Sequence, residues 1–193
     1  MRTSPLLAML FCAGCAANGI PREVLAIARS TKPGGEFHIE VDSEGRVVEA
    51  GAAVALDSVP AACRAGADAA HPGGRQTGAE RVWADGSVRW LVAKEIDGRA
   101  RELLLRDDGT VFGGEEVLAQ SAWPDAVVQA AKAAVPGATL ERVEHVWGLE
   151  ARGAETYHVK LRDRGESVRV GLSSEAKVLR VVRRLPGQVR VPR

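Results

Sequence analysis

Hydrophobic positions follow one spacing at three places along the chain. A large apolar residue precedes a proline, and a Pro-Gly pair begins twelve residues after that proline, in segments 20–34, 59–73 and 123–137. Proline is tolerated in the first turn of a helix, where its missing N–H has no helical partner, and Pro-Gly ends a helix. Between the prolines, apolar or small residues at positions 3, 6, 7 and 10 share one helical face. The pattern predicts three helices of about 12 residues that pack closely against a sheet.

Runs typical of strands follow the second and third predicted helices. In the third segment, Tyr157, Val159 and Leu161 alternate with His158 and Lys160, as expected for a strand with two different faces. Only one predicted hairpin, in residues 37–48, follows the first helix. Three turns separate four runs after each of the other two helices, at 85–86, 97–98 and 108–109, and at 148–153, 163–165 and 173–176.

The spacing predicts an α+β fold built from tandem copies of one unit, a short helix packed on a four-stranded antiparallel sheet, with the first copy incomplete. Trp83 and Trp147 each stand eleven residues after the second proline of their unit. We therefore expect both rings to be buried against the helix of their own unit. The boundaries that we assign are 20–58 for the incomplete unit, 59–122 and 123–185 for the complete units, and 186–193 for a basic tail.

The order of these elements resembles that of the PepSY-like family of bacterial envelope proteins. The resemblance rests on a helix that opens with apolar-Pro and closes with Pro-Gly, followed by four strands whose last turn contains Asp107-Asp108-Gly109-Thr110. It covers 59–122 and 123–185 well, and 20–50 in part. It implies a fold similar to β-lactamase inhibitory protein, secretion, and a binding or inhibitory role without enzyme activity, but no agreed ligand and no defined site residues.

The N-terminal residues are typical of a targeting segment. Arg2 precedes an apolar run that is too short to span a bilayer and that ends in Ala13-Gly14-Cys15. Small residues before such a cysteine resemble the lipobox of bacterial lipoproteins, although Cys12 stands where an aliphatic residue is usual. We expect residues 1–14 to be a signal peptide, Cys15 to be lipidated, and 15–19 to be a tether. The alternative is an ordinary secretory peptide cut near Ala17.

Charge is balanced overall and uneven along the chain. The sequence has 26 Lys and Arg against 25 Asp and Glu, which argues against a dedicated nucleic-acid binder. Residues 160–193 hold ten of the basic residues and three acids. This stretch could contact anionic lipid, an anionic envelope polymer or an acidic protein, or it could only keep a strand edge soluble. The candidate contact residues are Arg180, Arg183, Arg184, Arg190 and Arg193.

Histidine and carboxylate residues offer one pattern that could hold a metal. His38, Glu40 and Asp42 alternate on a predicted strand and so would share one face. The opposite face carries apolar residues, as in any amphipathic strand, so we expect polar strand residues and no metal. His145 and His158 fall on neighbouring predicted strands and could form a second ligand set, but here too we expect ordinary polar strand residues.

Catalytic motifs were not found. The sequence has no Gly-x-Ser-x-Gly, no phosphate-binding glycine loop and no paired-cysteine metal knuckle. Cys63 occupies the helix position that Val24 and Val127 fill in the other two predicted helices, so we expect a buried structural thiol and not a nucleophile. We therefore expect no enzyme activity and no cofactor.

These observations favour a non-enzymatic binding protein, exported to the bacterial cell envelope and anchored to the membrane through Cys15. The leading hypothesis is an inhibitor or modulator of an envelope enzyme. The alternatives are a structural envelope lipoprotein without a specific enzyme target and a metal-sensing module.

Overall fold

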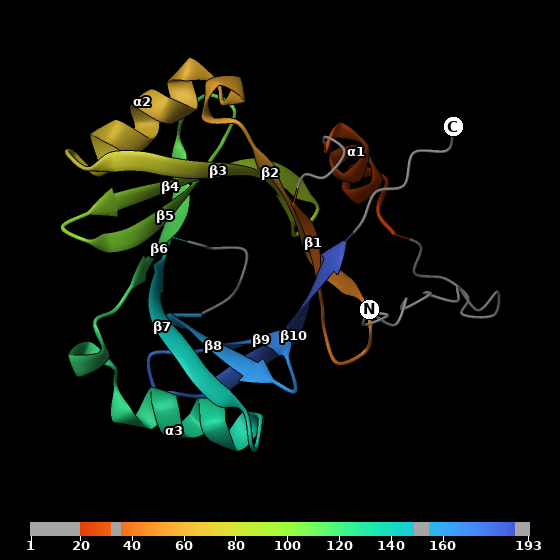
Figure 1. Ribbon diagram of the computed structural model, residues 1–193, viewed down its shortest axis with the longest axis vertical. Coiled ribbons are helices and arrows are strands. Elements are labelled where there is room, and N and C mark those ends of the chain that lie inside the picture. The colour runs from red at the N-terminus through yellow and green to blue at the C-terminus, as the bar shows by residue number, and fades with distance from the viewer. Residues whose placement is uncertain (1–19, 32–35, 149–154, 188–193) are drawn as a thin grey trace, which may run out of the picture.

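The computed structural model describes residues 20–31, 36–148 and 155–187. These residues form one antiparallel sheet of ten strands that closes into a barrel, with three α-helices spaced around its outside (Figure 1). The elements, in chain order, are α1 (Arg22–Ser30), β1 (Phe37–Val41), β2 (Val47–Val54), the 3-10 helix η1 (Leu56–Ser58), α2 (Ala61–Ala70), β3 (Arg75–Ala84), β4 (Ser87–Ile96), β5 (Arg99–Leu105), β6 (Val111–Val117), η2 (Gln120–Ala122), α3 (Asp125–Ala134), β7 (Thr139–Trp147), β8 (Tyr157–Asp163), β9 (Glu166–Leu172) and β10 (Val178–Gly187).

The three predicted helices and the α+β class are confirmed, whereas separate four-stranded sheets are wrong. Strand β2 pairs with β3, β6 pairs with β7, and β10 pairs with β1, so the strands that follow each helix join into one sheet. The physical reason is that each separate sheet would leave two edges of unpaired N–H and C=O groups, whereas closure of the barrel leaves no strand at an open edge of the sheet. The alternation of apolar and polar residues along each strand is the same in separate sheets and in a closed barrel, so the sequence pattern could not distinguish them.

Three of the four apolar clusters lie on the outside of the barrel, beneath the helices, and a small fourth one, Leu104 and Val146, faces the inside. Helix α1 places Val24 and Ile27 on the small residues of β2, and α2 and α3 cover their own clusters in the same way. Small residues on the facing surfaces let each helix lie close to the sheet. Gly66 of α2 shows how close, because a Cβ there would lie 2.2 Å from the carbonyl oxygen of Gly109 in the turn between β5 and β6.

The prediction for the two tryptophans is wrong in part. Trp83 is buried, with 8% of its surface exposed, but it belongs to the cluster of α1 and not to that of α2. Trp147 is 37% exposed, and its ring meets that of His71 at the end of α2, with 6.2 Å between the ring centroids. Each ring therefore lies at the helix that precedes its unit, because the closed sheet carries the ends of β3 and β7 beyond their own helices.

Among the described residues, no helix has the length and apolar character needed to cross a membrane.

Candidate functional site

The inside of the barrel is polar and charged. Side chains alternate between the two faces of a strand, so the strands that send apolar residues outward to the helices send polar residues inward. On β8, for example, Val159 and Leu161 belong to the outer cluster of α3, while His158 is fully buried on the other face. The buried charged and histidine side chains of the interior include His38, Glu40, Glu115, Glu144, Glu155, His158 and Arg169.

Arg169 of β9 is the main cation of the interior. Its side chain is 7% exposed, and its Nη2 donates to Glu40 and lies 3.4 Å from an oxygen of Glu49. Burial lowers the pKa of Arg169, but Glu40 and Glu49 outweigh this and raise it above its usual value. Strands β1 and β2 are thereby tied electrostatically to β9, across the point where the barrel closes.

His158 of β8 lies between two carboxylates. Its Nε2 is 2.7 Å from Glu155 Oε2, and its Nδ1 is 3.0 Å from Glu115 Oε1. Burial acts to lower the pKa of His158, but Glu115 and Glu155 outweigh it and raise the pKa above its usual value. The ring also lies next to Arg169, whose Nη1 is 3.4 Å from Nδ1.

Glu155 has its place because of a glycine. A Cβ on Gly171 would lie 2.6 Å from the Glu155 carboxyl carbon, so only glycine leaves room for this carboxylate against β9. Gly51 does the same for His38, since a Cβ there would lie 2.4 Å from the imidazole ring.

Glu144 of β7 carries an unsatisfied oxygen. Its side chain is 1% exposed, and its Oε1 lies 2.8 Å from Arg142 Nε and 3.3 Å from Lys160 Nζ. Its Oε2 is buried and has no hydrogen-bond partner. Burial raises the pKa of Glu144 to about 7. Burial also raises the pKa of Glu102, with the nearby Glu115 adding to the effect. Carboxylates therefore crowd this part of the interior.

A cavity of about 50 Å³ lies beside these groups. A space of this size can hold a water molecule or a small ion. Its walls carry five carboxylates and three cationic side chains, together with His38 and three apolar residues. They are Glu40, Glu49, Glu80, Glu102, Glu115, Lys160, Arg169, Arg184, His38, Val82, Leu91 and Leu104.

His38 takes no part as a cation. Nδ1 of its ring lies 2.8 Å from Nη2 of Arg184. Arg184 can donate a hydrogen bond to Nδ1 only when Nδ1 carries no proton. Burial, and after it the positive charge of Arg184, lowers the pKa of His38 to about 4. His38 is thus a neutral acceptor in the wall of the cavity.

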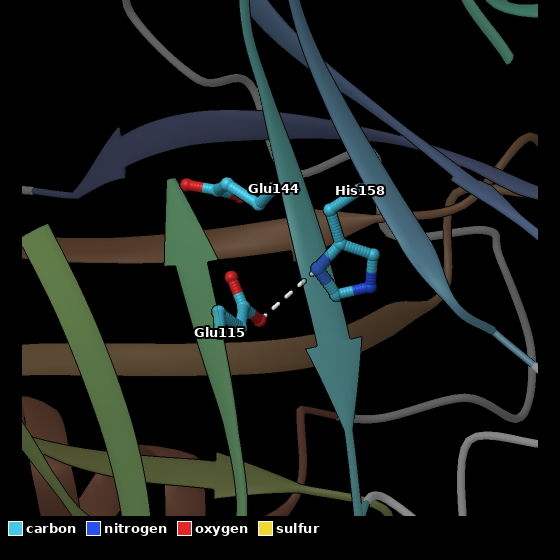
Figure 2. A group of neighbouring side chains, drawn as sticks. All are labelled: Glu115, Glu144 and His158. Atoms are coloured by element: carbon cyan, nitrogen blue, oxygen red, sulfur yellow. Dashed lines mark ion pairs between the residues drawn. The ribbon is translucent and has the colours of Figure 1, made fainter. Parts of the chain in front are cut away.

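One group of the described residues has the spacing of a metal site. Glu115, Glu144 and His158 each offer a ligand atom, and these atoms lie within 4.8 Å of one another. Figure 2 shows the three side chains together, from the adjacent strands β6, β7 and β8, with the ion pair between Glu115 and His158 dashed. Imidazole and carboxylate ligands suit first-row transition metals.

The structure does not assemble the metal pattern considered from the sequence. His38 and Glu40 point into the barrel, whereas Asp42 lies in the following turn and accepts hydrogen bonds from Glu44 and Arg46. The three residues form no group with ligand spacing. The bulge at Val41 and the turn after it separate Asp42 from the other two residues.

His145 and His158 lie on opposite faces of the sheet. His145 is the register partner of Tyr157, whereas His158 is the partner of Glu144, the residue before His145. Because side chains alternate along a strand, the two histidines point to different sides.

The basic candidates are divided between the two faces of β10. Arg180 lies 2.9 Å from Glu155, and Arg184 is bonded to His38, so both turn inward. Arg183 points outward and pairs with Asp163 and Glu166. Arg190, Arg193 and the proposed lipidation residue Cys15 lie outside the described residues.

Cys63 lies where the helix pattern placed it. It is fully buried in the cluster of α2, and its Sγ donates to the Arg106 carbonyl oxygen at 3.2 Å. Burial raises the pKa of this thiol, which lowers its reactivity as a nucleophile. The expectation of a buried cysteine is confirmed.

Sequence reasoning did not find Glu115, Glu144, Glu155 and Arg169. The available signal was the alternation of charged with apolar residues along β7, β8 and β9, which predicts one polar face but does not tell whether that face meets solvent or the inside of a closed barrel. Closure depends on pairing between distant strands.

The fold and the site define an α+β barrel protein with a charged, carboxylate-rich interior. No family model matches the chain, and none of the curated proteins matches it.

Three solved structures are similar in part. A DUF2874 family protein from Bacteroides uniformis has 13% identity and a TM-score of 0.49 over 64% of this chain and 88% of its own. A candidate periplasmic protein from Bacteroides eggerthii has 13% identity and a TM-score of 0.49 over 65% and 88%. A BLIP-like protein from Bacteroides fragilis has 16% identity and a TM-score of 0.44 over 64% and 86%. At these identities and TM-scores, the likeness carries no argument about function.

Proposed function

We propose that this protein is an exported, non-enzymatic binding protein whose barrel interior holds a small cation. Export rests on the N-terminal segment, which is typical of a signal peptide ending at Cys15. The cation rests on one observation, the excess of carboxylates over cationic side chains around the interior cavity. Uncompensated buried charge is costly, and a bound cation would offset it.

The burial of three interior carboxylates supports this proposal. Burial raises the pKa of Glu80, Glu102 and Glu144, so their charged form is disfavoured in the absence of a nearby cation. Burial acts in the same direction on Glu115 and Glu155, but His158 outweighs it and lowers the pKa of both. A cation that enters the cavity would favour the charged form of the first three carboxylates. Because the cavity is about 50 Å³, we expect an inorganic ion and not an organic amine.

A cation screen tests the function. A ligand that binds only the folded state raises the melting temperature in proportion to the logarithm of its concentration above Kd. The purified protein, freed of metal by chelation, should show such a rise with at least one ion among Na⁺, K⁺, Mg²⁺, Ca²⁺, Mn²⁺ and Zn²⁺. Tetramethylammonium chloride controls for ionic strength, and equal small shifts with every salt would contradict the proposal.

A second candidate, modulation of an envelope enzyme, is favoured by Trp147. This ring is 37% exposed on the outside of the barrel, and aromatic side chains are enriched at protein interfaces. Crosslinking in the native envelope, with partners compared between the wild-type protein and Trp147→Ala, tests it. Capture of one enzyme that the variant loses would support this function, and an unchanged set of partners would oppose it.

A further inference from the structure

We infer that Glu115, Glu144 and His158 form a binding site for a divalent transition-metal ion. This inference rests on the proposed cation-binding function and names one site within it. Three adjacent strands supply the three side chains, so the sheet fixes their spacing. Glu144 and His158 are direct register partners on β7 and β8, and β6 pairs with the other edge of β7. Ligands held on rigid strands need little rearrangement on binding.

The unsatisfied oxygen of Glu144 is an independent observation that points to a ligand. Glu144 is 1% exposed, and its Oε2 lacks a hydrogen-bond partner, as described above. A buried carboxylate oxygen without a partner carries a desolvation cost. One carboxylate oxygen of Glu144 lies within 4.8 Å of the ligand atoms of Glu115 and His158, so a cation bound between the three residues would offset the cost of burying this carboxylate.

Glu155 supplies the support that metal-binding histidines usually have. Histidine ligands almost always donate their second ring N–H to a carboxylate, carbonyl or water, which fixes the tautomer and the ring orientation. Nε2 of His158 lies 2.7 Å from Glu155 Oε2, so Nδ1 is the nitrogen on the side of Glu115. The ion would take the place of the Nδ1 proton and would be coordinated by one carboxylate oxygen each from Glu115 and Glu144.

Nearby cations set the expected strength. Lys160 Nζ is 3.3 Å from Glu144 Oε1, and Arg169 Nη1 is 3.4 Å from His158 Nδ1. Both oppose a divalent ion by like-charge repulsion. We therefore expect reversible binding, weaker than in the closed four-ligand sites of structural zinc proteins.

Zn²⁺ binding measured by titration calorimetry is the first test. The metal-free protein should bind one equivalent of Zn²⁺, and Glu144→Gln and His158→Gln should each weaken binding at least tenfold. Glu155→Gln should weaken it by about 10- to 100-fold, as for other residues that support a metal ligand. His145→Gln and Glu141→Gln are matched controls on the same strand β7 and should bind as the wild type does, because His145 faces outward and Glu141 is exposed.

Imidazole NMR of the unmutated protein is the second test, and it does not depend on whether the variants fold. Zn²⁺ should shift the ring ¹⁵N signals of His158 and leave those of His38 and His71 in place. Absence of Zn²⁺ binding by the wild-type protein, or binding that moves no His158 signal, would overturn the site. Stabilisation by another ion, unaffected by Glu144→Gln, would remove this site and keep the cation-binding function, whereas no stabilisation by any ion would remove both.

Discussion

At the residue scale, the charged residues inside the barrel are stabilised by specific partners. Arg169 pairs with Glu40 and Glu49, and His158 pairs with Glu115 and Glu155. All of these pairs except His158–Glu155 join strands that are distant in sequence. Buried ion pairs contribute little net stability compared with apolar residues of similar volume, but removal of one partner leaves a buried charge uncompensated. Single substitutions in this network should therefore be far more damaging than those of surface pairs.

Replacement of Arg169 tests this statement. Arg169→Met leaves Glu40 and Glu49 without their cation, so the free energy of unfolding should fall by about 3–5 kcal/mol. The matched control is Arg183→Met, since Arg183 is 44% exposed and pairs with Asp163 and Glu166 on the surface. Its loss should be below about 1 kcal/mol. Urea unfolding of both variants measures the two values, and losses of similar size would contradict the role given to Arg169.

The pH dependence of stability should report the burial of His38. The pKa of this ring is about 4 in the folded protein, while its ordinary value, which applies to an unfolded chain, is 6.5. As the pH falls below 6.5, the unfolded state takes up a proton that the folded state does not, so stability is lost between 6.5 and about 4. The full loss is about 3 kcal/mol, because each pKa unit corresponds to about 1.4 kcal/mol.

His38→Gln isolates this contribution. The glutamine side chain does not titrate, so the variant should lack the His38 component of the acid sensitivity. Urea unfolding of both proteins from pH 7.5 to pH 4 gives the difference in their unfolding free energies. That difference should change by about 3 kcal/mol in favour of the variant as the pH falls, and a constant difference would mean that His38 is protonated in the folded protein as easily as in the unfolded one.

At the scale of elements, the positions of helices and hairpins are determined by sequence signals that lie within a few residues of their ends. The prolines before α1, α2 and α3 and the turn residues between strands act locally, which is why the three helices were predicted from spacing alone. The pairing of β10 with β1 and of β6 with β7 depends on contacts between distant segments, which no local pattern encodes. The candidate site consists of residues that face the interior, so it could not be recognised before closure of the sheet was known.

The close approach of α2 to the sheet gives an element-scale prediction. In an exposed helix interior, replacement of glycine by alanine stabilises by about 1 kcal/mol. At Gly66 the new Cβ would lie 2.2 Å from a backbone oxygen that has little freedom to move, so Gly66→Ala should instead destabilise by about 1–3 kcal/mol. Gly78→Ala is the control, because a Cβ on Gly78 would meet no atom within 4 Å. Thermal unfolding should separate the two variants, and a stabilised Gly66→Ala would show that α2 lies farther from the turn.

The two tryptophans should behave differently although the sequence places them at equivalent positions. Trp83 is 8% exposed under α1, so Trp83→Ala should cost about 3–5 kcal/mol of unfolding free energy. Trp147 is 37% exposed, and Trp147→Ala should cost clearly less, about 1–2 kcal/mol, because much of its ring already meets solvent. Chemical denaturation of the two variants compares them directly, and equal costs would restore the equivalence that the repeat suggested.

At the scale of the whole molecule, closure of the sheet makes the three helix-and-strand units, 20–58, 59–122 and 123–185, depend on one another. Each unit has a helix with an apolar cluster beneath it, yet these clusters include residues of the neighbouring unit, and the strands of every unit pair with those of its neighbours. The charged interior belongs to no single unit, since Glu40, Glu115 and Arg169 come from three different ones. A unit of about 60 residues is also marginally stable by itself. Cooperative folding of the whole barrel follows from these facts.

Division of the chain between Ala122 and Trp123 tests that conclusion. The fragment 20–122 would expose the edges of β1 and β6, and 123–187 would expose those of β7 and β10, because the cut removes both pairings that join the halves. Open edges favour aggregation, and the cut also separates Arg169 from Glu40 and His158 from Glu115. Each fragment alone should lack a cooperative thermal transition by circular dichroism, whereas co-expression of the two should restore one and yield a 1:1 complex on size exclusion. Independent tandem units would instead unfold cooperatively as separate monomers, so a sharp transition in either isolated fragment would show that the units do not depend on closure of the barrel.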